Sequence, residues 1–143
     1  MWRETNFSYL PALHALQALN HGDISKAIEL LQVAAPYELG LPPSAEFGLF
    51  GALYPVYVRG VAYLAEKKGV EAAAEFQKIL DHPGIIFNDP IGALAYLQLG
   101  RAFSLSRDKT KARTAYQHFL ALWKDADPDI PILKQAKAEY AQM

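Results

Sequence analysis

The stretches Gly60-Val61-Ala62-Tyr63 and Ala72-Ala73-Ala74-Glu75-Phe76 decide the fold of this chain. They set a small residue, a bulky one three positions on, a small one nine further and a second bulky one after four more. The same spacing recurs twice, in Ala15, Ala18, Ala27 and Leu31 and in Gly100, Phe103, Ala112 and Tyr116. Three copies in register predict an internal repeat.

Each repeat has the pattern of two packed helices. The small residues allow a close helix crossing, and the bulky residue one turn later fills the space beside it. Turn signals separate the two helices of each unit, at Asn20-His21-Gly22-Asp23, Lys67-Lys68-Gly69 and Ser106-Arg107-Asp108. The chain lacks a convincing strand-like alternation of apolar and polar residues. We therefore predict an all-α fold, an α-α superhelix of about three helical hairpins plus a C-terminal capping helix.

The predicted organisation is a single domain over residues 1–143. Its units span about 9–35, 52–82 and 89–124, and the capping helix spans 129–142. The interval between units is uneven, since 45 residues separate Ala27 from Ala72 and 40 separate Ala72 from Ala112. The surplus lies in residues 36–51 and 82–90.

The composition of this 143-residue chain argues against several function classes. Fourteen Lys and Arg residues are balanced by fifteen Asp and Glu, so we expect no nucleic-acid partner. The absence of cysteine excludes disulfides, thiolate zinc sites and cysteine catalysis. The four histidines lack metal-ligand spacing, and no apolar run is long enough to insert into a membrane. We predict no catalytic residues, no metal, no cofactor and no enzymatic activity.

The repeat resembles the tetratricopeptide repeat (TPR), whose signature includes Gly-x-x-Tyr followed by Ala-x-x-x-Phe and Pro. Here the matching residues are Gly60, Tyr63, Ala72, Phe76 and Pro83. A narrower resemblance, carried by segments such as 54–60, 75–82 and 119–129, is to the C-terminal TPR region of bacterial (notably acidobacterial) eukaryotic-type serine/threonine kinases and winged-helix regulators. The usual TPR interval is about 34 residues, so the long loops depart from the family. The compartment is not fixed: the resemblance implies the cytoplasm, or an extracytoplasmic location if a membrane-spanning kinase is attached.

The TPR resemblance implies that the first helix of each unit lines a concave face that binds a peptide or protein, or an upstream domain of the same chain. The residues that match the groove positions, and that we take as candidate partner-binding residues, are Tyr9, Tyr54, Tyr57, Val61, Leu97, Arg101 and Ser104. Tyr and Arg often dominate interface energies because they desolvate well and still donate hydrogen bonds. In the competing interpretation, Tyr54 and Tyr57 pack beneath residues 36–51.

Two further features need partners. Arg59 lies on a nearly all-apolar helix, which predicts that it pairs with a carboxylate inside the array. From Tyr9 to Leu19 apolar residues surround most of the first helix, although a terminal repeat helix needs a polar outer face. We expect preceding repeats, a partner domain or a second copy to cover it, with the polypeptide continuing upstream and a possible homodimer through this helix.

The residues thus favour a non-catalytic protein-protein interaction module, and the narrower resemblance implies that it belongs to a bacterial signalling protein. The alternative is a structural oligomerisation unit whose groove is filled by its own loops, and a third candidate is a small-ligand sensor.

Overall fold

The computed structural model describes residues 9–39, 53–86 and 89–143, and all regular secondary structure within those ranges is helical. The all-α prediction is therefore confirmed. The elements are α2 (Leu10–Asn20), α3 (Ile24–Gln32), the 3-10 helix η2 (Ala35–Tyr37), α4 (Tyr54–Ala65), α5 (Gly69–Leu80), α6 (Pro83–Ile86), α7 (Ile91–Leu105), α8 (Lys109–Leu122) and α9 (Pro131–Ala141).

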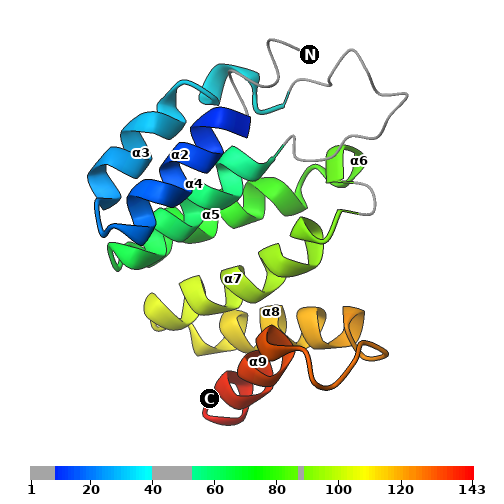
Figure 1. Cartoon of the computed structure of the whole chain (residues 1–143). Coiled ribbons are helices and arrows are strands. Elements are labelled where there is room, and N and C mark those ends of the chain that lie inside the picture. The colour runs from blue at the N-terminus through cyan, green and yellow to red at the C-terminus, as the bar shows by residue number, and fades with distance from the viewer. Residues whose placement is uncertain (1–8, 40–52, 87–88) are drawn as a thin grey trace.

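The helices form antiparallel hairpins that stack in chain order. Figure 1 shows α2 and α3 at one end, α4 and α5 next, α7 and α8 beyond them, and α9 against the last pair. Each hairpin also contacts its neighbour: α4 packs on α2 and α3, α5 packs on α7, and α9 packs on α8. This arrangement is the predicted stack of helical hairpins with a final capping helix.

The hairpin turns repeat in the backbone as well as in the sequence. Gly22, Lys67 and Arg107 occupy the same place in their units, and each has positive φ, at 80°, 63° and 64° respectively. Two second helices then begin at aspartates: Asp23 accepts a hydrogen bond from the Lys26 amide at 3.0 Å, and Asp108 caps α8 in the same way. The recurrence of one turn geometry supports the repeat frame independently of the side-chain spacing.

The predicted contact between small and bulky residues holds each hairpin together. A Cβ atom placed on Gly60 would lie 2.6 Å from a ring carbon of Phe76, and one on Gly100 would lie 2.7 Å from the Tyr116 ring. Ala15 and Leu31, the corresponding pair of the first hairpin, are both fully buried. In the second and third hairpins the two helices therefore approach so closely that there is no room for a methyl group beside the ring.

Substitution of Gly60 by alanine tests this contact. The new methyl group would overlap the Phe76 ring, which is fully buried and packed edge-on against Tyr57, so the ring has little freedom to move. Overpacking of this kind costs roughly 1–3 kcal/mol, which exceeds the gain of about 1 kcal/mol from replacing a helical glycine by alanine. We expect Gly60→Ala to lower the free energy of unfolding in urea denaturation.

Gly84→Ala is the matched control, because nothing lies within 4 Å of a Cβ built at Gly84. We expect it to leave the unfolding free energy unchanged or slightly raised. Equal stability of the Gly60→Ala variant and the wild type would contradict the close approach.

Candidate protein-binding surface

Hydrogen bonds link α4, α7, α8 and α9 on the first-helix side of the stack. Nε2 of Gln98 donates to the Tyr57 hydroxyl at 2.9 Å, and Nη1 of Arg101 donates to Oε1 of Gln98 at 3.3 Å. Arg101 also donates from Nε and Nη2 to the Glu139 carboxylate, both at 2.9 Å, and the Tyr116 hydroxyl donates to Glu139 at 2.7 Å. We call these five residues the polar ladder. It joins two hairpins and the capping helix.

The electrostatics of the ladder fix its charged pair. Burial lowers the pKa of Arg101, but hydrogen bonds and charge attraction from Glu139 outweigh it and raise that pKa above its ordinary value. Burial likewise raises the pKa of Glu139, and the bonds from Arg101 and Tyr116 bring the net pKa below its ordinary value. Arg101 therefore stays protonated and Glu139 ionised at neutral pH, and each neutralises the other.

Most of the predicted site residues lie along this face. Tyr57 and Arg101 are joined through Gln98. Tyr54, 40% exposed, precedes Tyr57 by one helical turn, and Val61, partly exposed, follows it by one turn. Ser104 is exposed one turn beyond Arg101. These positions form one helix face on each of α4 and α7.

Two of the predicted residues lie elsewhere. Tyr9 is 43% exposed and immediately precedes α2, in the first hairpin. Burial, the Asp89 carboxylate and, to a smaller extent, Tyr9 raise the pKa of Tyr54. Leu97 is fully buried in a cluster with Phe119 and Leu133, because α9 covers this position on α7. Leu97 therefore lies in the core and cannot touch a partner in this conformation.

Two members of the polar ladder, Gln98 and Glu139, were not predicted as site residues from the sequence. The spacing of Gln98, three residues before Arg101 on one helix, was an available signal for a side-chain hydrogen bond. Glu139 is one of the polar residues that recur along one side of α9, so periodicity alone assigns it to the outer face. Its inward orientation is fixed by the docking of α9 on α8.

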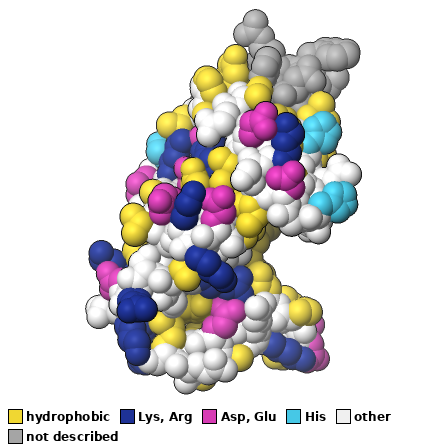
Figure 2. Space-filling model, turned by 90° about the vertical axis from the view of Figure 1, so that its left-hand side faces the viewer, with side chains coloured by type: hydrophobic (Ala, Val, Ile, Leu, Met, Phe, Trp, Pro, Cys, Tyr) yellow, Lys and Arg dark blue, Asp and Glu magenta, His cyan; other side chains and the backbone are white. Residues whose placement is uncertain are grey.

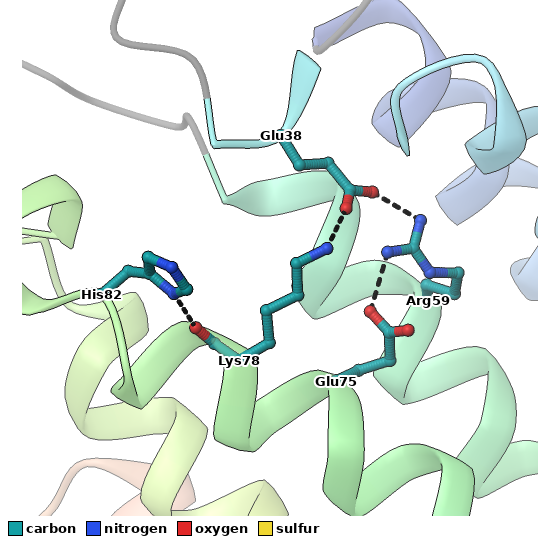
Figure 3. A network of polar contacts seen from close by, with 5 residues as sticks. All are labelled: Glu38, Arg59, Glu75, Lys78 and His82. Carbon is teal, nitrogen blue, oxygen red and sulfur yellow. Dashed lines mark hydrogen bonds and ion pairs between the residues drawn. The ribbon is translucent and has the colours of Figure 1, made fainter. Parts of the chain in front are cut away.

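A buried ion network ties the segment after η2 to the second hairpin (Figure 3). Nη1 of Arg59 donates to Glu38, Nη2 of Arg59 donates to Glu75 at 2.8 Å, and Nζ of Lys78 donates to the other Glu38 oxygen at 2.6 Å. The side chains of Arg59 and Glu38 are only 7% and 1% exposed. The prediction that Arg59 pairs with a carboxylate inside the array is confirmed.

The network sets the protonation state of Glu38. Burial raises its pKa, but hydrogen bonds and charge attraction from Arg59 and Lys78 act in the opposite direction, and the net pKa lies below the ordinary value of 4.5. Residues 36–39 are the described part of the segment expected to pack over Tyr54 and Tyr57. Within them, the Glu38 carboxylate contacts Arg59 and Lys78. Residues 40–51 of that segment lie outside the described ranges.

A groove also runs between α5 and α8, on the opposite side of α7 from the ladder. It comprises two hollows of about 580 and 550 Å³ that share Leu80 and Tyr96, and Tyr96 stacks on His118 with ring centroids 5.1 Å apart.

Figure 2 shows basic and acidic side chains interspersed among hydrophobic ones on the side of the stack that lies to the left in Figure 1. Within residues 9–39, 53–86 and 89–143, no group of His, Asp or Glu is placed to hold a metal ion. No helix of that described part has the length and apolar content to cross a bilayer.

Comparison with known proteins shows a partial similarity to chaperones. Chaperone protein YscY from Yersinia enterocolitica is 42% identical to this chain over 64 residues, which make up 45% of this chain and 51% of the relative. The relative of the same name from Yersinia pestis matches to the same extent. The chain thus spans about half the length of the curated relatives it matches. No protein-family profile and no solved structure matches it, and the resemblance to kinase or regulator regions finds no support here.

Removal of the Glu38 charge tests the buried network. Glu38→Gln leaves Lys78 without its carboxylate and Arg59 with Glu75 alone. We expect the free energy of unfolding to fall by about 3 kcal/mol, the lower end for breaking a buried ion pair. The control, Glu29→Gln, removes one partner of the surface ion pair between Lys26 and Glu29, in which the Glu29 side chain is 70% exposed. It should change the free energy of unfolding by less than about 0.5 kcal/mol.

The difference in unfolding free energy between the wild type and Glu38→Gln should depend on pH. Because the pKa of Glu38 is lower in the folded protein than its ordinary value of 4.5, the ionised network stabilises the fold above that pH. This contribution is lost as the pH falls through the folded pKa. The stability difference between wild type and Glu38→Gln, measured by urea denaturation, should therefore shrink on acidification below 4.5. A difference that is constant with pH would contradict the ion pairing.

Proposed function

We propose that this chain is a non-catalytic protein-interaction module that binds a peptide or protein segment along its first-helix side. The binding surface, which we call the partner face, comprises Tyr54, Tyr57, Val61, Arg101 and Ser104. The observation that carries the proposal is that exposed side chains on α4 and α7 flank an ordered tyrosine-glutamine-arginine connection. A surface whose polar groups are already held in place loses little conformational entropy on binding.

The chemistry of the partner face favours a neutral, partly apolar segment. Three of the five N–H groups of Arg101 donate to Glu139 and Gln98, so its guanidinium is oriented with donors remaining for a partner's carbonyl oxygens. Glu139 balances the charge of Arg101, so this face has little net electrostatic attraction for an acidic segment. Tyr54 and Val61 supply an aromatic and an aliphatic contact on the neighbouring helix.

The comparisons support a binding role. The relatives that share part of the chain are named as chaperone proteins, a term for proteins that act on other proteins. A kinase or regulator domain of the same polypeptide, implied by the resemblance of this chain to the C-terminal region of such proteins, is one candidate partner and stays a prediction.

Peptide selection followed by affinity measurement tests the proposal. A random peptide library is selected on the immobilised wild-type protein, and the selected peptides are measured by fluorescence polarisation. Tyr54→Ala removes a ring that is 40% exposed and whose hydroxyl donates to Asp89 at 3.4 Å. Ser104→Glu places a charge on the face at an exposed position. We expect each variant to raise the dissociation constant at least about tenfold, or about 1.4 kcal/mol.

Leu122→Ala is the control, since Leu122 is 61% exposed on α8, outside the partner face. It should leave the dissociation constant unchanged, and the three variants should melt close to the wild type. Selected peptides that bind equally well to the Tyr54→Ala and Ser104→Glu proteins, or the recovery of no peptide, would contradict the proposal.

A further inference from the structure

The first helix, α2, exposes a face that is buried in the equivalent helices of the next two hairpins. In the repeat frame Leu13 corresponds to Val58 and Gln98. Leu13 is 60% exposed, whereas Val58 and Gln98 are 1% and 8% exposed. Val58 packs in one cluster with Ala27 and Leu31 of α3, so the second helix of the preceding hairpin covers this position.

Leu10 shows the same contrast. It is 37% exposed, while its equivalents Pro55 and Ala95 are fully buried. Ala95 clusters with Ala72 and Ile79 of α5, again the second helix of the preceding hairpin. We call the contact between successive hairpins a seam. At both seams the cover therefore comes from the same structural element.

Gln17 completes the face one turn further along α2. It is exposed, and its equivalents Ala62 and Ala102 are fully buried. We call Leu10, Leu13 and Gln17 the stacking face of α2. No described hairpin precedes α2 (Figure 1). The described stack therefore ends on residues whose equivalents are buried between the later hairpins.

A hollow lies beside the stacking face, and one of its lining residues corresponds to a residue that is buried at the next seam. It has a volume of about 350 Å³ between α2 and α3 and is lined by His14, Gln17, Ala18, Lys26 and Leu30, among others. His14 corresponds to Arg59, which is buried at the next seam and contacted there by Glu38. At the end of the stack the same place is open to side chains of a partner.

From these observations we propose that the stacking face of α2 is the interface with a second copy of this chain. Residues 9–22 contain no Asp, Glu, Lys or Arg, so two copies of α2 can pack together without like-charge repulsion. The Gln17 amide has both donors and an acceptor and can pair with Gln17 of the second copy. An interface made of the same face on both copies closes as a two-fold dimer.

The opposite end of the stack disfavours an open head-to-tail assembly. The exposed side of α9 carries Lys134, whose side chain is 60% exposed, and Lys137. Packing that side onto Leu13 would remove charged groups from water without a carboxylate partner on α2, which is costly. Self-association should therefore stop at the dimer.

Sedimentation equilibrium of three proteins tests the dimer. We expect the wild type to sediment as a dimer and Leu13→Glu, which places a charge at the centre of the stacking face, to raise the dimer dissociation constant at least about tenfold. Val70→Glu is the matched control, since Val70 is 73% exposed on α5, and it should dimerise like the wild type. A monomeric wild type, or equal association of the two glutamate variants, would overturn the proposal.

Cross-linking gives a second readout that does not depend on tolerance of a charge. Because the chain contains no cysteine, Leu13→Cys and Val70→Cys each carry a single thiol. A short bis-maleimide should join two Leu13→Cys chains into a dimer on a denaturing gel and leave Val70→Cys monomeric. Equal cross-linking of both variants, or of neither, would overturn the proposal even if Leu13→Glu fails to fold. Ser104→Glu should not alter either result, so a failure here is distinct from a failure of the partner face.

Discussion

The close contact between a small residue on the first helix of a hairpin and an aromatic ring on the second is the constraint on which the rest of the structure depends. Gly60 beneath Phe76 and Gly100 beneath Tyr116 leave no space for a methyl group, which fixes how near the paired helices lie. The same two rings also contact other side chains: Tyr57 packs edge-on against Phe76, and the Tyr116 hydroxyl donates to Glu139. The packing of each hairpin thereby sets the positions of the side chains that form the polar ladder.

The second hairpin departs from this apolar scheme at one position, and the long connection before it supplies the compensation. Arg59 occupies the place that Leu99 holds in the next hairpin, and both are buried. A lone buried guanidinium would be strongly destabilising. Glu38, from the surplus that lengthens the first inter-unit interval to 45 residues, pairs with it, and Glu75 and Lys78 complete the charge balance. The uneven repeat interval thus has a structural consequence: it brings a carboxylate to a seam that needs one.

The sequence allowed the fold to be predicted because the signal is local. The spacing of Gly60, Phe76 and their counterparts reports contacts within one hairpin, and the isolated charge of Arg59 reports a need for a partner. The candidate site was predicted less completely. Periodicity assigns a residue to a face of its helix but does not say which other helix covers that face, so Leu97 was expected on the surface and Glu139 outside the stack. Both depend on how α9 docks. The positive φ of Lys67 and Arg107 was not predicted from the sequence either, although the glycine at the equivalent position, Gly22, is the residue type that favours it.

The two proposed surfaces differ in chemistry in a way that keeps their roles separate. The partner face has an arginine held between a glutamine and a glutamate, and its remaining N–H donors have fixed directions. The stacking face is uncharged and mostly aliphatic, which suits a permanent contact between identical helices more than discrimination among partners. A two-fold dimer through α2 would also carry two partner faces on one particle. Two weak contacts to a partner with two matching segments would then reinforce each other through their high effective concentration. A module with a modest individual affinity could in this way bind tightly to a repetitive or dimeric partner and only weakly to a single peptide.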